Sequence, residues 1–127
     1  MNPYASPAAY RESSVLTASP EQLVVMLYDG VGRFLRQAEA AMVEASYEQA
    51  HERLNRGEAI IDELLATLDM DQGQVAERLQ AIYVYCKRCL MEARRDRAAD
   101  KIALVVRLLA ELRDAWAQVA TSGAAVA

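Results

Sequence analysis

Four segments of about 20 residues carry apolar side chains at steps of three and four residues, and this spacing constrains the fold more than any other feature. The period matches that of an amphipathic α-helix with one buried face. We expect helices over residues 19–44, 47–69, 74–95 and 99–121. A chain of 127 residues suits a single domain. Four such helices with short connections predict an all-α, antiparallel, up-down-up-down four-helix bundle.

The first helix has a well-defined start in the sequence SPEQ at residues 19–22. A serine N-cap followed three residues later by glutamine can form a capping box, and proline is tolerated at the first helical position. The preceding residues contain two prolines and no sustained periodicity, so they are expected to form an arm rather than a helix. We therefore expect an N-terminal arm at 1–18, a bundle at 19–121 and a flexible tail at 122–127.

Two glycines lie inside the first expected helix, Gly30 and Gly32. A glycine in a helix interior costs about 1 kcal/mol relative to alanine. Close approach of a neighbouring helix could offset this cost, so both glycines are expected to serve packing within the bundle.

Composition and charge indicate a protein partner. The net charge is −4 with a pI near 5.0, so no overall basic surface for nucleic acid or anionic lipid is expected. No apolar run approaches the roughly 20 residues needed to span a bilayer, and the N-terminus lacks the pattern of a signal peptide. We expect a cytoplasmic protein without membrane insertion.

The expected helices carry more apolar side chains than one bundle seam requires. Packing by neighbouring helices could cover the extra side chains, or they could line a groove for an amphipathic helix of a partner. The candidates for partner binding are Ile60, Leu64, Leu104, Leu108, Val84 and Met91. In the free protein the arm, with Tyr4, Tyr10 and Val15, could cover part of this groove.

Catalytic and metal-binding patterns are incomplete in this sequence. Cys86 and Cys89 have the spacing of a metal or redox pair, but a zinc site needs two more good ligands. Glu48 and His51 form one Glu-x-x-His pair, whereas a di-iron bundle needs two such pairs and two further carboxylates. We expect no enzyme activity, no metal and no cofactor. A histidine phosphotransfer bundle that uses His51 remains an alternative.

The arm and first helix, NPYASPAAYRESSVLTASPEQLVVMLYDG, resemble the N-terminus of the flagellar secretion chaperone family. The resemblance continues in AIIDELLATLD at 59–69, IYVYCKRCLMEA at 82–93 and LRDAW at 112–116. The chain differs from the family pattern near the end of the third helix, at Val84, Cys86, Cys89, Arg94, Arg97 and Ala98. The capping of this helix is therefore expected to differ as well.

The resemblance implies a cytoplasmic bundle that binds the C-terminal segment of flagellin, prevents its premature polymerisation and keeps it available for export. It also implies that the arm lies over part of the groove and is displaced by flagellin. Further partners that fit this reading are components of the export apparatus or an anti-sigma factor. A regulatory bundle that sequesters another flagellar protein remains a second alternative.

Overall fold

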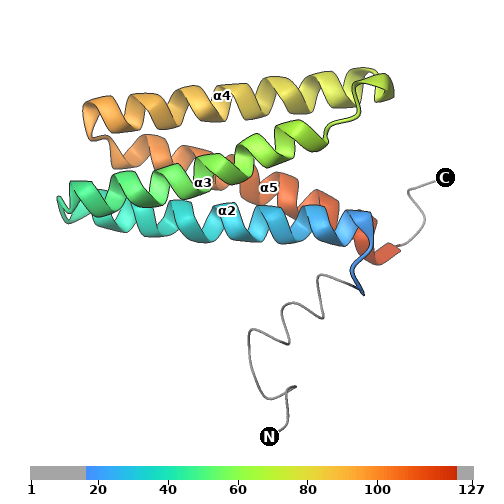
Figure 1. Cartoon of the computed structure of the whole chain (residues 1–127), viewed down its shortest axis with the longest axis horizontal. Coiled ribbons are helices and arrows are strands. Elements are labelled where there is room, and N and C mark those ends of the chain that lie inside the picture. Colours follow the sequence, from blue (N-terminus) through green and yellow to red (C-terminus); the bar gives the residue numbers. More distant parts are fainter. Residues whose placement is uncertain (1–16, 123–127) are drawn as a thin grey trace, which may run out of the picture.

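The computed structural model describes residues 17–122, which form four α-helices joined by short connections (Figure 1). The helices are α2 (Pro20–Val43), α3 (Tyr47–Thr67), α4 (Gln74–Asp96) and α5 (Ala99–Ser122), and a short 3₁₀ helix, η2 (Met70–Gln72), precedes α4. The all-α antiparallel bundle predicted from the sequence is confirmed. Most of the predicted arm, including Tyr4, Tyr10 and Val15, and the end of the predicted tail lie outside the described residues.

Each helix packs mainly against two neighbours, as expected for an up-down-up-down bundle. α2 makes the most extensive contacts, with α3 on one side and α5 on the other. α4 completes the bundle by packing against α3 and α5, but less extensively than α2 does. The start of α2, the end of α3, the start of α4 and the end of α5 therefore lie at the same end of the molecule (Figure 1).

The predicted capping box at the start of α2 is present. The Ser19 hydroxyl accepts a hydrogen bond from the backbone N–H of Gln22, and the Gln22 side chain accepts one from the backbone N–H of Ser19. Both donors would otherwise lack a partner within the helix. Pro20 occupies the first helical position, where its missing N–H removes no hydrogen bond.

Glycine packing occurs mainly where α2 crosses α3. A Cβ on Gly57 would lie only 2.7 Å from Cδ2 of Leu35, and one on Gly30 would lie 3.2 Å from Cδ1 of Ile60. The expectation that Gly30 serves packing between helices agrees with this geometry. Gly32 is different, since the nearest atoms belong to Arg36 on its own helix. Gly57 is thus the position with the least space for a side chain.

Two arginines at the end of α4 contact α3. Arg94 donates hydrogen bonds to Glu58 and Asn55 of α3 at 2.9 Å each. The guanidinium of Arg97 lies 4.1 Å from the ring centroid of Tyr47. Arg97 also has the left-handed backbone conformation that closes α4, with φ 52°. Two positions at which the chain differs from the family pattern therefore connect the end of α4 to α3.

Candidate functional site

An apolar pocket of about 420 Å³ opens at the end of the bundle where α2 begins and α3 joins α4. It is lined by side chains from all four helices and from the α3–α4 connection: Pro20, Leu23, Val24, Leu27, Leu64, Thr67, Leu68, Asp69, Gln72, Val75, Ala76, Leu79, Tyr83 and Trp116. Asp69 is the single charged side chain in this lining. The pocket therefore favours an apolar ligand.

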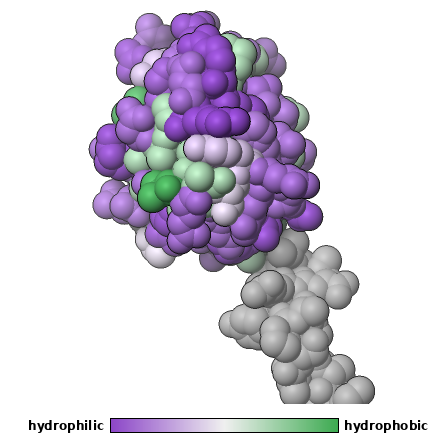
Figure 2. Space-filling model, turned by 90° about the vertical axis from the view of Figure 1, so that its left-hand side faces the viewer, coloured by the Kyte–Doolittle hydropathy of each residue, from purple (hydrophilic) through white to green (hydrophobic). Residues whose placement is uncertain are grey.

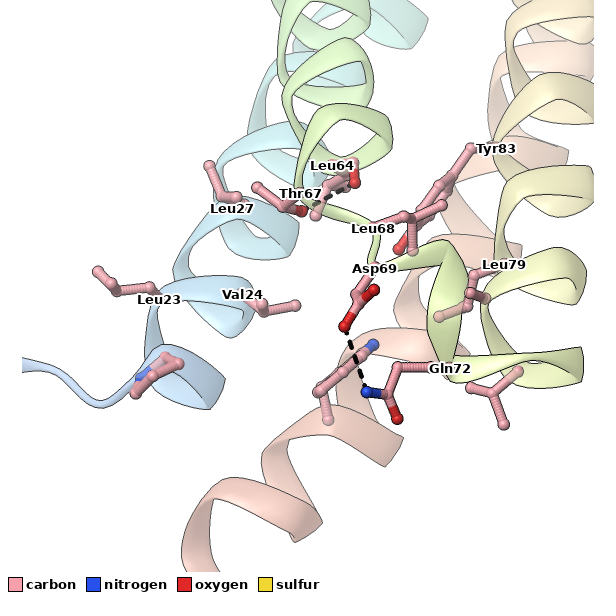
Figure 3. A pocket seen from close by; sticks show the side chains of 14 residues that line it. Leu23, Val24, Leu27, Leu64, Thr67, Leu68, Asp69, Gln72, Leu79 and Tyr83 are labelled. Atoms are coloured by element: carbon pink, nitrogen blue, oxygen red, sulfur yellow. Dashed lines mark hydrogen bonds between the residues drawn. The ribbon is translucent and has the colours of Figure 1, made fainter. Parts of the chain in front are cut away.

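The walls of the pocket come from helices far apart in the sequence. Leu23 and Leu27 of α2 lie on one side and Leu79 of α4 lies on the other, with Leu64 and Leu68 between them (Figure 3). Such branched aliphatic side chains, spaced along helices, suit the apolar anchors of an amphipathic partner helix.

The connection between α3 and α4 forms the polar edge of the pocket. One carboxylate oxygen of Asp69 accepts a hydrogen bond from the backbone N–H of Asp71, at 3.0 Å. The other accepts one from the side-chain amide of Gln72, at 3.2 Å (Figure 3). These bonds hold the connection in the 3₁₀ turn, so that it forms a fixed border rather than a loop across the opening.

Tyr83 of the pocket lining belongs to a buried tyrosine pair. The hydroxyl groups of Tyr28 and Tyr83 are hydrogen bonded to each other, which joins α2 to α4. Burial raises the pKa of Tyr28 above its usual range, the Tyr83 hydroxyl raises this pKa further, and a hydrogen bond with Trp116 lowers it. Burial also raises the pKa of Tyr83. Both tyrosines are therefore neutral at physiological pH and act as hydrogen-bonding groups.

The six predicted partner-binding residues do not form one surface. Leu64 alone among them lines the pocket, and it is a buried residue with 1% of its surface exposed. Ile60, Leu104 and Leu108 are partly buried and pack against the core. These three positions favour the packing alternative left open by the sequence.

Val84 and Met91 lie apart from the pocket on α4. They were expected to point away from the core, and they are 47% and 56% exposed. Val75, in the first turn of the same helix, is 65% exposed and does line the pocket.

Sequence reasoning missed most of the pocket, including Leu23, Val75 and Leu79 as possible binding residues. Leu23 and Val75 lie in the first turns of their helices, and Leu68 lies just after the end of α3. Apolar residues at three neighbouring helix ends were the available signal. The predicted site rested instead on an excess of apolar residues around the helix circumference, and such an excess does not detect a site at the end of a bundle.

The opposite end of the molecule has a different surface. Hydrophilic side chains cover most of it, and hydrophobic ones form only a small strip (Figure 2). This end contains the α2–α3 and α4–α5 connections. The large apolar pocket and this mainly hydrophilic surface therefore lie at opposite ends of the bundle.

The candidate reactive side chains lie in ordinary structural settings. Cys86 and Cys89 are buried and unbridged, and burial raises the pKa of the Cys86 thiol to about 12, which disfavours the reactive thiolate. His51 is exposed on α3. Within residues 17–122, no group of three or more histidine, cysteine, aspartate or glutamate side chains could hold a metal ion. None of the described helices is long and apolar enough to cross a membrane.

A four-helix bundle with an apolar pocket and a polar edge on one side is suited to bind an apolar segment of another protein. Comparison with known families defines the class of protein. The family described as "Flagellar protein FliS" matches residues 1–123. The chain belongs to this family of flagellar secretion chaperones, which are not enzymes.

Individual relatives agree with this assignment over most of their length. The chain is 35% identical to the flagellar secretion chaperone FliS of Bacillus subtilis over 117 residues, which cover 92% of this chain and 85% of the relative. It is 36% identical to FliS of Salmonella typhimurium over 110 residues, or 85% of this chain and 82% of the relative. For FliS of Campylobacter jejuni the identity is 33% over 112 residues, which cover 87% and 88% of the two chains. The histidine phosphotransfer alternative is not supported.

Proposed function

We propose that this chain is a cytoplasmic export chaperone that binds the C-terminal segment of flagellin in the apolar pocket. Bound in this way, flagellin is kept from polymerising prematurely and remains available to the export apparatus. The observation that carries the proposal is the pocket itself, which has an apolar lining and a single charged side chain, Asp69. An amphipathic helix can fill such a site with side chains at helical spacing.

Binding is expected to be moderate in affinity for the area that it buries. A disordered client segment loses conformational entropy when it becomes ordered on the chaperone. This loss favours release at the export apparatus, since part of the free energy of contact is spent on ordering the client.

The N-terminal arm is proposed to cover the pocket in the absence of flagellin. Thr17, the first described residue, precedes Pro20, which lines the pocket. Thr17 therefore lies three residues before a residue of the pocket lining. The apolar side chains of the arm, Tyr4, Tyr10 and Val15, are the candidates for contacts that flagellin would replace. Export-apparatus components and an anti-sigma factor are further candidate partners.

Two valines on α4 provide the test, because both are exposed and only Val75 lines the pocket. Val75→Asp is expected to weaken binding of a flagellin C-terminal peptide at least tenfold, about 1.4 kcal/mol. Val84→Asp introduces the same charge on the same helix and is expected to change the affinity less than about twofold, an effect of roughly 0.4 kcal/mol. Isothermal titration calorimetry measures both.

The two valine variants also test whether flagellin binds the pocket or the exposed face of α4 that includes Val84. Equal loss of binding in both variants would extend the site along α4. Loss only in Val84→Asp would place the client on the outer face of α4 and refute the pocket. Denaturant melts of both variants serve as the control for folding, since surface substitutions usually change stability by less than about 0.5 kcal/mol.

A further inference from the structure

Five acidic residues lie in the lining of the apolar pocket or next to it along the sequence. Asp69 lines it directly, and four more acidic residues each lie next in sequence to a lining residue: Glu21, Glu63, Asp71 and Glu77. All but Glu21 are exposed, and Glu21 is partly exposed. We call these five residues the acidic rim. One cation, Arg78, occupies a comparable position next to Leu79.

The acidic rim has no cationic partner within the described part of the chain. The ion pairs among residues 17–122 connect other acids, for example Lys87 with Asp62, Arg94 with Glu58 and Arg113 with Asp29. Asp69 binds a backbone N–H and an amide, neither of which carries a charge. No ion pair among the described residues therefore neutralises a carboxylate of the acidic rim.

Eight of the 13 arginine and lysine residues in the described part of the chain lie away from the pocket. Arginine and lysine side chains are concentrated in the second half of α4 and the adjoining turns of α3 and α5: Arg53, Arg56, Lys87, Arg88, Arg94, Arg95, Arg97 and Lys101. Several of these cations pair with acids, for example Arg94 with Glu58 and Lys101 with Glu92, so the pocket end carries more net negative charge than the other end. Such a distribution selects partners by charge complementarity and accelerates their association.

We propose that the pocket selects an apolar helical segment with lysine or arginine residues on its flanks. The apolar face fills the pocket, and the flanking cations lie against the acidic rim. This inference rests on the proposed function, because it assigns a charge pattern to the client of the same site. Residues 1–16 do not fit this pattern, since Arg11 and Glu12 are their only charged side chains and cancel.

The test uses two synthetic peptides with the same apolar helical core, one flanked by two lysines at each end and the other by two glutamines. At low salt the full-length chain is expected to bind the lysine-flanked peptide about tenfold more tightly, since several exposed ion pairs each contribute modestly. In 1 M salt, where screening acts within about 3 Å, the difference is expected to shrink below about twofold.

Matched variants locate the effect. The rim variant carries Glu63→Gln, Asp71→Asn and Glu77→Gln, and is expected to bind both peptides with similar affinity at low salt. The control variant neutralises three exposed acids at the opposite end of the bundle, with the substitutions Glu44→Gln, Glu48→Gln and Asp100→Asn. This control is expected to keep the preference for the lysine-flanked peptide.

Each result has one meaning. Equal binding of the two peptides at low salt would overturn the proposal and show that the pocket accepts apolar segments regardless of charge, the arm included. If the rim and control variants both keep the preference for the lysine-flanked peptide, the lysines are recognised by a surface other than the acidic rim. Failure of the proposed function is seen separately: neither peptide would bind, or Val75→Asp would bind both as tightly as the natural chain.

Discussion

Among the described glycines, Gly57 is the position where an added side chain would have the least space. It lies where α3 meets α2, and any Cβ would be 2.7 Å from Cδ2 of Leu35, a buried side chain with little freedom to move. Gly32 is buried too, but its nearest neighbour is the end of the flexible Arg36 side chain, at 3.2 Å. The same amino acid is therefore required by packing at one position and not at the other.

Alanine substitutions are expected to separate these two glycines. Gly57→Ala should lower the free energy of unfolding by about 1–3 kcal/mol, because the added methyl group overpacks the core. Gly32→Ala should leave it unchanged or raise it by up to about 1 kcal/mol, since alanine favours the helix and Arg36 can move aside. Urea denaturation measures both. A Gly57→Ala variant as stable as the natural chain would show that α2 and α3 can separate without cost.

The turn between α2 and α3 is closed by backbone hydrogen bonds at the end of α2. After α2, the backbone N–H of Ser46 donates to the carbonyl of Ala41 at 2.8 Å, and that of Ala45 donates to Met42 at 3.1 Å. These two bonds define a Schellman motif, in which the residue after the helix has a positive φ and is usually glycine. Here the residue is Ala45, with φ 60°.

Ala45→Gly is expected to stabilise the protein by about 0.5–1 kcal/mol, because glycine adopts a positive φ without a steric cost. Arg97→Gly is the comparison, since Arg97 also has a positive φ but contacts the ring of Tyr47. Loss of that contact, worth about 0.5–1 kcal/mol, should cancel the gain. Thermal unfolding followed by circular dichroism gives both values. Destabilisation by Ala45→Gly would contradict the assignment of strain to this turn.

The sequence was sufficient to predict the helices but not the pocket. The capping box set the start of α2 at Pro20, and the segment after α3 contains the Gly73 that precedes α4, with φ 71°. These are local signals, read within a few residues. The pocket depends on how the ends of α2, α3 and α4 pack together, because this packing brings Leu23, Leu68 and Val75 into one lining. The sequence of a single helix does not encode that packing.

At the scale of the whole molecule, the packing of the four helices is unequal. α2 packs closely against α3 and α5, whereas α4 makes fewer contacts with its neighbours. The first half of α4 is also the wall of the pocket, through Val75, Leu79 and Tyr83. The least tightly packed helix thus borders the proposed binding site, which suits a pocket that must open to admit a client segment.

Hydrogen exchange is expected to follow this difference in packing. Amides of residues 74–83 in α4 should exchange faster than those of residues 28–38 in α2, because local opening requires the loss of fewer buried contacts. A bound flagellin peptide should slow exchange at 74–83 and change it little at 28–38. Mass spectrometry after deuterium labelling resolves the two segments. Uniform protection of both helices in the free protein would refute a weakly held α4.

The intrinsic fluorescence of Trp116 can report whether the pocket is occupied. Trp116 is the only tryptophan in the chain, and its indole is partly exposed in the pocket lining. An apolar ligand would remove water from this ring, and tryptophan emission shifts to shorter wavelength when its surroundings become less polar. The natural protein can thus report pocket occupancy by its fluorescence, without a label or a substitution.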